Sequence, residues 1–363
     1  MKRGHYDVLI LGGGPAGSAA AIELARGGVA VAVLERSNYE GSRIGEMLPP
    51  EASPLLRALG VWESFQRDEH LAAPGIVFAW TTNDPQETDF IFNPFGNGWQ
   101  LDRTRFDAML ASAAEEAGAT VLRGVRAQQC RRSTGGSWQV PLLHHPVHAV
   151  SGSFLIDATG RSAWPTRRQG VRRIAMDRLV GVVGHLQQTR RNDQRLLLEA
   201  FAHGWWYSAT LPGDRTIAAC MTDADYLPHG RDELRRFWDD CLRQAPLTAE
   251  AIGAVQTLGD LQTVSANTAR MEVVHGPGWI AVGDAAASYD PLSSRGISKA
   301  LESGLRAAQA VARWVRDRHD TLPDYAAWFE EDFDSYQRHY RHFYGRVTRW
   351  PDSQFWQRRA AAS

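Results

Sequence analysis

The feature that most constrains this chain is a glycine-rich turn near its amino terminus, with the sequence Gly12-Gly-Gly-Pro-Ala-Gly17. The apolar run at residues 6–11 precedes the turn and predicts a buried parallel strand. Residues 18–26 predict a helix that ends at two glycines, and residues 29–35 form a second apolar run. This order of strand, turn, helix and strand predicts that the chain begins as a Rossmann-type α/β unit.

Each glycine of the turn has a separate physical role. Gly12 allows the tight turn, Gly14 lets the backbone approach a pyrophosphate, and Gly17 lets the helix lie close to the sheet. The amino terminus of the helix that follows the turn presents free N–H groups and the positive end of its dipole to the phosphates. Glu35 ends the second strand, where a carboxylate can accept hydrogen bonds from an adenosine ribose. The segment therefore predicts a dinucleotide site.

Length, charge and cysteine content narrow the class of protein. The chain has 363 residues, which is enough for about two domains. Its formal net charge of −1 argues against a nucleic-acid partner. Cys130, Cys220 and Cys241 form no C-x-x-C pair, so we expect reduced thiols, no bound metal and a cytoplasmic location. The sequence has no apolar run of eighteen residues, and we expect no membrane contact.

The chain leaves the simple alternation of strands and helices after Glu35. Residues 75–80, 89–92 and 204–212 are apolar or aromatic and predict strands of a second, antiparallel sheet. Residues 231–244 predict a helix beside that sheet, residues 261–269 predict one more strand of it, and the last fifty residues predict further helices.

Two further motifs each follow a predicted buried strand: Asp157-Ala-Thr-Gly160 and Gly283-Asp284. With the glycine turn, they make the chain resemble the flavoprotein monooxygenase superfamily, which includes aromatic hydroxylases, flavin-dependent halogenases and geranylgeranyl reductases. The resemblance implies non-covalent FAD and an α/β fold with an inserted substrate domain. It implies an FAD-binding domain at residues 1–74, 101–175 and 271–320, an antiparallel-sheet substrate domain at residues 75–100 and 176–270, and a helical carboxyl-terminal segment at residues 321–363.

The resemblance also implies roles for residues along the cofactor. Asp284 is expected to hydrogen-bond the ribityl chain, and Arg103 is expected to contact the cofactor. A helix starting near Ser294 is expected to point its amino terminus at the flavin pyrimidine ring, where its dipole stabilises the negative charge of reduced flavin. The full set of expected cofactor residues is Gly12, Gly14, Ala16, Gly17, Glu35, Arg36, Arg43, Arg103, Asp157, Gly160, Gly283, Asp284, Pro291, Arg295 and Gly296.

The two groups that carry halogenase chemistry are missing from the sequence. Ser293 stands where the similar halogenases have a glutamate, and they also require a lysine in the region that matches residues 69–80. The only lysines of this chain are Lys2 and Lys299. We therefore expect a protein that is not a functional halogenase.

The resemblance instead implies a monooxygenase that uses FAD and O₂ to hydroxylate an electron-rich aromatic ring through a flavin C4a-hydroperoxide. Ala158 replaces a glycine of the hydroxylases that oxidise NAD(P)H in place, so the electron donor is either NAD(P)H or a partner flavin reductase. Glu46, Ser293 and Ser294 are the candidate catalytic residues. Trp80, Trp99 and Trp206 are the candidate walls of the aromatic pocket.

Two short stretches narrow the resemblance further. Gly204-Trp-Trp-Tyr-Ser208 and Asp290-Pro-Leu-Ser-Ser-Arg-Gly296 are most similar to the flavoproteins that mature tryptophan-derived quinone cofactors. The substrate implied is an indole on a partner protein or carrier. The aromatic and arginine-rich residues 336–356 are expected to dock that partner; the alternative is that they pack against the flavin domain. A double-bond reductase of the geranylgeranyl reductase type and a flavin-binding maturation chaperone remain alternatives.

Overall fold

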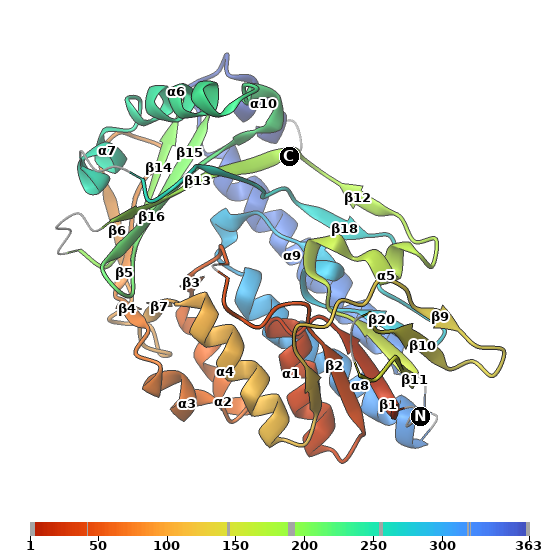
Figure 1. The fold of residues 1–363 in the computed structure, drawn as a ribbon. Coiled ribbons are helices and arrows are strands. Elements are labelled where there is room, and N and C mark those ends of the chain that lie inside the picture. The colour runs from red at the N-terminus through yellow and green to blue at the C-terminus, as the bar shows by residue number, and fades with distance from the viewer. Residues whose placement is uncertain are drawn as a thin grey trace.

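The computed structural model describes residues 4–41, 43–143, 146–187, 193–253, 257–317, 319 and 321–360 (Figure 1). Its largest sheet has the strand order β19-β20-β11-β1-β2-β8, and β9 and β10 extend it beside β11. These strands are β1 (Gly4–Leu11), β2 (Val31–Leu34), β8 (Thr120–Leu122), β9 (Arg131–Arg132), β10 (Trp138–Pro141), β11 (Ala149–Asp157), β19 (His275–Gly276) and β20 (Trp279–Ala281). Because β1 pairs in parallel with both β2 and β11, their carboxyl ends lie at one edge of the sheet.

Helices cover this sheet and bury the apolar strands. They are α1 (Pro15–Arg26), α4 (Arg103–Glu116), α8 (Gly296–Asp317) and α9 (Leu322–Gly345). Close packing depends on glycine at two positions. A Cβ atom on Gly17 would lie 1.9 Å from the carbonyl oxygen of Gly12, and one on Gly304 would lie 2.2 Å from that of Ala16. The helix after the turn can therefore lie against both β1 and α8.

The second large sheet has the order β17-β13-β16-β15-β14-β5-β6. Its strands are β5 (Gly75–Ala79), β6 (Gln86–Asp89), β13 (Leu179–Gln187), β14 (Leu196–Phe201), β15 (Gly204–Leu211), β16 (Arg215–Asp223) and β17 (Gln262–Ser265). Every neighbouring pair is antiparallel except β14 and β5, which are parallel. Helices α6 (Arg231–Leu242) and α7 (Pro246–Ile252) lie on the face turned away from the first sheet (Figure 1).

Two three-stranded sheets and several short helices complete the described chain. One small sheet has the order β3-β7-β4 and the other β12-β18-β21. The strands are β3 (Met47–Leu48), β4 (Leu71–Ala73), β7 (Gly98–Gln100), β12 (Arg173–Ala175), β18 (Ala269–Met271) and β21 (Ala287–Ser288). The short helices are η1 (Pro50–Ala52), α2 (Ser53–Ala58), α3 (Trp62–Arg67), η2 (Gly160–Ser162), α5 (Trp164–Arg167), η3 (Ala224–Tyr226), η4 (Gly283–Ala285), η5 (Pro291–Ser293) and α10 (Gln354–Ala360).

The fold is the Rossmann-type α/β fold with a largely antiparallel second sheet and carboxyl-terminal helices that the sequence predicts. Two element predictions are wrong. Residues 89–92 were expected to form a strand, but β6 ends at Asp89, and Ile91 and Phe92 are exposed. Residues 261–269 divide between two sheets, because β17 pairs with β13 whereas β18 starts at Ala269 and pairs with β12. We retain, as a proposal, the division of the chain into an FAD-binding part and a second-sheet part that the sequence suggests.

The structure buries several aromatic residues of the stretch 336–356, as the packing alternative expects, and docking of a partner by its exposed residues stays a prediction. Tyr344 is 1% exposed, and its hydroxyl donates to Asp290 Oδ2 at 2.8 Å and accepts from Trp205 Nε1 at 2.8 Å. Phe355 and Trp356 are buried in the same apolar cluster as the second sheet. Aromatic side chains of α9 and α10 therefore pack against both the FAD-binding part and the second sheet, and they fill the space where these two parts meet.

Candidate functional site

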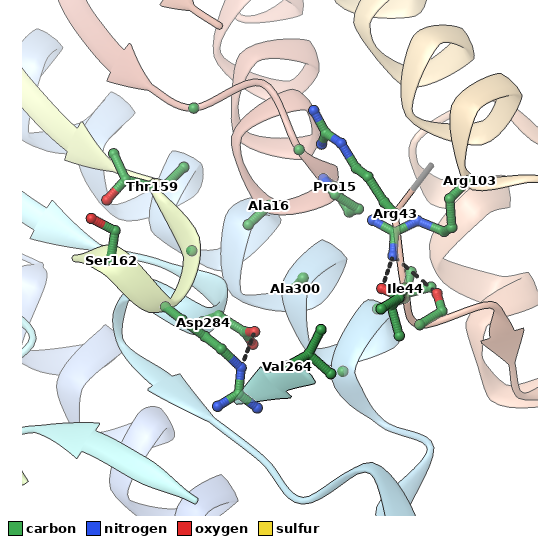
Figure 2. Close-up of a pocket in the computed structure, with 18 of the residues that line it drawn as sticks. Pro15, Ala16, Arg43, Ile44, Arg103, Thr159, Ser162, Val264, Asp284 and Ala300 are labelled. Carbon is green, nitrogen blue, oxygen red and sulfur yellow. Dashed lines mark hydrogen bonds and ion pairs between the residues drawn. The ribbon is translucent and has the colours of Figure 1, made fainter. Parts of the chain in front are cut away.

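A cleft with a volume of about 1310 Å³ lies where the carboxyl ends of β1, β2 and β11 face the second sheet. One wall comes from the glycine turn, the ends of these strands and the start of α8; the other comes from β14, β15 and β16. Figure 2 shows Pro15 and Ala16 in the middle, with Arg43 and Arg103 on one side of them and Thr159 and Ser162 on the other. Ligands of open α/β sheets bind at this edge, so the cleft is the candidate site.

The glycine turn has the backbone geometry that a pyrophosphate requires. Gly12 has φ +105°, and a Cβ atom there would lie 2.2 Å from the carbonyl oxygen of Ala158. A Cβ atom on Gly14 would meet only the Arg43 guanidinium, at 3.8 Å, so this backbone is open to the cleft. The amino terminus of α1 lies directly behind it, with Pro15 and Ala16 in the lining. These residues fit the phosphates of FAD.

Glu35 lies at one end of the cleft and holds the turn in place. Its Oε2 accepts from Gly13 N at 2.8 Å, and its Oε1 accepts from Ser37 N at 2.9 Å. Arg43 approaches Oε1 at 3.2 Å and also pairs with Asp107 at 2.7 Å. Burial favours a higher pKa for Glu35, but the hydrogen bonds from Ser37 and Gly13 and the charge of Arg43 outweigh it and lower the pKa. Glu35 is thus an ionised acceptor beside the predicted ribose position.

Asp284 projects into the middle of the cleft from η4 (Figure 2). Its Oδ1 lies 3.2 Å from Lys299 Nζ, and its Oδ2 lies 3.8 Å from Arg161 Nε. Burial opposes ionisation, but the charges of Lys299 and Arg161 dominate and lower the pKa of Asp284. Lys299 is itself 4% exposed and is held behind this carboxylate. Sequence analysis missed Arg161 as a site residue, although it directly follows Gly160.

Several expected cofactor residues support the cleft without lining it. Both carboxylate oxygens of Asp157 are used by Thr159 and Thr166, at 2.6 to 3.0 Å, and Ala158, Thr159 and Gly160 line the cleft in its place. Gly17 and Gly283 are packing positions, since a Cβ atom on Gly283 would lie 2.8 Å from Ala16 Cβ. Direct contact of the Asp157 carboxylate with cofactor is therefore corrected to a role in holding the loop.

The expected cofactor residues near α8 divide in the same way. Pro291 and Gly296 line the cleft, and α8 begins at Gly296. Arg295, by contrast, lies outside the lining and donates to Asp332 Oδ1 at 2.6 Å. Arg36, which follows β2, lines the cleft beside Glu35.

Arg103 braces the loop that crosses the cleft. Its Nη1 donates to the carbonyl oxygens of Ile44 at 3.2 Å and Gly45 at 2.9 Å. Its Nε and Nη2 form a fork on the Asp107 carboxylate, both at 3.1 Å. Arg103 lines the cleft, but four of its hydrogen bonds serve the protein, and they fix the backbone that carries Glu46.

Glu46 and Tyr207 join the two walls of the cleft. The Tyr207 hydroxyl donates to Glu46 Oε2 at 2.7 Å, and Gly45 N donates to the same oxygen at 3.0 Å. Glu46 Oε1 is buried and has no hydrogen-bond partner in the described chain. Burial raises the pKa of Glu46 above its ordinary value despite the Tyr207 and Gly45 hydrogen bonds. Glu46 lines the cleft, and a carboxyl group with one unpartnered oxygen is suited to transfer a proton.

The two candidate serines have different positions. Ser294 lines the cleft and has a left-handed backbone conformation, with φ 50°. Ser293 turns away, because its hydroxyl donates to the carbonyl oxygen of Asp290 at 2.8 Å, and it is absent from the lining. Asp290 is a cleft residue that sequence analysis missed; burial, followed by the charge of Asp177, raises its pKa to about 7.

The expectation that Trp80, Trp99 and Trp206 wall the substrate pocket is wrong, since none of them lines the cleft. Trp80 donates to the carbonyl oxygen of Phe343 at 2.8 Å, and Trp99 packs among the aromatic rings of α3. Trp206 is fully buried against Trp238, with ring centroids 4.6 Å apart. Side chains alternate along β15, so Trp205 and Tyr207 face the cleft and Trp206 faces α6.

Three further features of the described residues bear on the class of site. No group of three His, Cys, Asp or Glu side chains in these ranges is arranged to hold a metal ion. None of the described helices is long and apolar enough to cross a bilayer. Cys130, Cys220 and Cys241 are free and buried.

Comparison with known proteins agrees with this geometry. Residues 5–326 match the model of a family described as FAD binding domain. The putative FAD-dependent oxidoreductase LodB of Marinomonas mediterranea is 31% identical over 365 residues, which cover 99% of this chain and 98% of LodB. The 1H-pyrrole-2-carbonyl-[peptidyl-carrier protein] brominase of Pseudoalteromonas luteoviolacea is 26% identical, covering 88% of this chain and 80% of the brominase.

Two solved structures share the fold over almost the whole chain. The flavin-dependent halogenase CmlS has a TM-score of 0.86 and 25% identity, and the match covers 99% of this chain and 68% of CmlS. The peptidyl tryptophan dihydroxylase QhpG, essential for tryptophylquinone cofactor biogenesis, has a TM-score of 0.78 and 26% identity. That match covers 98% of this chain and 78% of QhpG. The similar proteins thus include both halogenases and a hydroxylase.

Proposed function

The chain belongs to the FAD-binding-domain family, and from that premise we propose that it is a monooxygenase that hydroxylates an electron-rich aromatic ring. The observation that carries this proposal is Glu46, whose buried carboxyl group has one free oxygen in a cleft suited to FAD. When bound, reduced FAD supplies activated oxygen derived from O₂. One oxygen atom enters the ring and the other leaves as water, while two electrons come from NAD(P)H or a partner flavin reductase.

The protein's own residues would bind the cofactor and handle the proton. We propose that the glycine turn holds the pyrophosphate, that Asp284 accepts from the ribityl hydroxyls, and that α8 points its amino terminus at the flavin ring. Oxygen transfer to an aromatic carbon leaves that ring with a proton to lose. Glu46 Oε1 can accept this proton, and the raised pKa of the carboxyl group makes it a stronger base than an exposed glutamate.

Hydroxylation is favoured over halogenation by the position of the one lysine in the cleft region. Lys299 is buried behind Asp284, so its amine has no free approach to a substrate on the second-sheet side. Ser293, at the position of the halogenase glutamate, donates to the backbone and faces away from the cleft. We propose that the protein lacks halogenase activity, although several similar proteins are named as halogenases.

The substrate we propose is an aromatic group carried by a macromolecule, with a tryptophan side chain as the first candidate. The names of two similar proteins support this kind of substrate. The brominase is named for a pyrrole carried on a peptidyl-carrier protein, and QhpG is named for peptidyl tryptophan. Trp205 and Tyr207 give the second-sheet wall the apolar character that an indole requires.

The test combines the FAD-loaded protein with a reductant, isotopically heavy O₂ and two probes: a tryptophan-containing peptide and free indole. Mass spectra should show one heavy oxygen atom added to a probe, and an added chloride or bromide salt should give no halogenated product. Glu46→Gln should lower oxygenation by roughly 10²-fold or more while FAD remains bound. Reduction of a double bond without O₂ would support the reductase alternative, and partner binding without turnover would support the chaperone.

A further inference from the structure

A second hollow opens beside the cleft and is rich in arginine. It has a volume of about 620 Å³, and its lining includes Trp164, Arg167, Arg168, Arg172 and Arg173, which we call the arginine groove. Trp164 and Arg168 line both the groove and the cleft, so the two spaces are adjacent. A volume of this size is within the range of small-molecule sites.

The groove is built by the loop that Asp157 holds. Asp157 Oδ2 accepts from Thr166 N at 3.0 Å and from the Thr166 hydroxyl at 2.6 Å, which fixes the short helix α5 to the end of β11. This helix and the residue after it carry Trp164, Arg167 and Arg168. The next residues of the chain lead into β12, which brings Arg173 into the lining of the groove. The arginines are thus placed by a buried anchor.

Positive charge in the groove is largely uncompensated. Within the described ranges, the side chains of Arg167 and Arg168 have no hydrogen-bond or ion-pair partner. Arg173 donates to the carbonyl oxygen of Asp284 at 3.1 Å and to the Ser288 hydroxyl at 2.9 Å. Burial lowers the pKa of Arg173, and the charges of Arg161 and Arg167 add to this effect while that of Asp284 opposes it.

One carboxylate, that of Glu272, lies at the rim of the groove and does not neutralise the positive charge of the other arginines. Arg172 is exposed and pairs with Glu272 at 2.7 Å. The whole chain has a formal net charge of −1, so the arginine excess is a local property of this groove. Such a concentration of unpaired guanidinium groups attracts a compact anion.

The shape of these groups selects one class of anion. Guanidinium forks bind phosphate with two parallel hydrogen bonds, which an ammonium group cannot do. The Arg168 guanidinium also lies 5.8 Å from the centroid of the half-buried Trp164 ring, which holds it against a flat apolar surface. The lining therefore offers donors for a phosphate group and an aromatic face for the part of the ligand next to it.

We propose that the arginine groove binds a phosphate ester of a second ligand that extends from the groove into the FAD cleft. The proposal rests on the proposed function, because an oxygenation in this cleft requires an electron donor and a substrate besides FAD. Two ligands share this phosphate chemistry: a pyridine dinucleotide that donates electrons, and a phosphopantetheinyl arm that carries a substrate.

The test measures binding of paired probes to the FAD-loaded protein by calorimetry. The pairs are NADP⁺ with NAD⁺, and pantetheine 4′-phosphate with pantetheine; within each pair the members differ by one phosphate, and neither oxidised nicotinamide can reduce the flavin. We expect the phosphorylated member of one pair to bind about tenfold more tightly, and added salt to weaken that binding. The pair that shows the difference identifies the source of the phosphate.

The variant Arg167→Gln/Arg168→Gln should raise the dissociation constant of that probe by about tenfold or more. Arg178→Gln is the matched control, because Arg178 is an exposed arginine just beyond β12 that pairs with Asp225. Both changes are at the surface, and flavin absorbance reports FAD content in each protein. Equal binding within both pairs, or unchanged binding by the double variant, overturns the groove proposal. A protein without FAD or oxygenase activity instead overturns the proposed function.

Discussion

Glu46→Gln should change how the stability of the protein depends on pH. The Glu46 carboxyl group is 2% exposed and has donors on one oxygen alone, Tyr207 and Gly45 on Oε2. An ionised carboxylate is poorly solvated there, so burial raises its pKa above the ordinary value of 4.5. The folded protein therefore keeps the proton at pH values where the unfolded chain has lost it.

The sign of the effect follows from proton binding. The folded state binds more protons than the unfolded state between the unfolded and folded pKa values of Glu46, so the free energy of unfolding falls as pH rises through this range. The loss amounts to about 1.4 kcal/mol for each unit by which the pKa is raised. Glutamine has the same shape and does not ionise, and its oxygen can accept from Tyr207. The variant therefore lacks this pH-dependent loss.

The assay is guanidinium unfolding of the FAD-loaded protein followed by circular dichroism from about pH 5 to about pH 9. We expect Glu46→Gln to be less stable than the wild type by about 1 to 2 kcal/mol at the acid end, because its N–H₂ group lacks an acceptor. The difference should shrink or reverse as pH rises. Glu51→Gln is the control, since Glu51 is an exposed neighbour bonded to Asn93 at 3.0 Å. A constant difference at every pH would refute the raised pKa.

Three further predictions concern the cofactor, the chemistry and the carboxyl-terminal helices. Asp284→Ala should lose FAD on desalting, measured by flavin absorbance, because a charge-assisted hydrogen bond of about 1.5 to 3 kcal/mol is removed; full flavin retention would contradict its assignment. Free tryptophan supplied with reduced FAD, O₂ and bromide should give no brominated product in mass spectra, and such a product would show that a lysine beside the substrate is dispensable. Truncation after Gly345 should prevent stable folding, because it removes the buried side chains of Phe355 and Trp356 and also Arg359, the ion-pair partner of buried Asp223. Loss of that ion-pair partner alone costs about 3 to 5 kcal/mol. An unchanged melting temperature would contradict this packing.

The sequence was informative where function depends on neighbours along the chain. The strand, glycine turn and helix of residues 6–26 are specified locally, since Gly12 and Gly17 are needed for a conformation and a close approach that other residues cannot adopt. Asp284 and Gly296 were also identified from short motifs, and both line the cleft. Alternation along β15 separates Trp206 from Trp205 and Tyr207, but it does not tell which face meets the cleft.

Contacts between distant segments required the tertiary structure. Glu46 and Tyr207 are 161 residues apart, and their hydrogen bond exists because the loop braced by Arg103 crosses to the second sheet. The burial of Trp356 depends in the same way on where α10 meets that sheet. Aromatic and arginine residues suit both a docking surface and a packed interface, so composition could not choose between them.

The sequence by itself determined the α/β class, the FAD-type glycine turn and the absence of a lysine where halogenases need one. The tertiary structure decided which polar groups line the cleft: Glu46 lines it and keeps one oxygen without a partner, whereas the carboxylate of Asp157 and the hydroxyl of Ser293 are used by nearby groups. The physical reason is that backbone conformation responds to adjacent residues, whereas burial and hydrogen-bond partners depend on how the two sheets are set against each other.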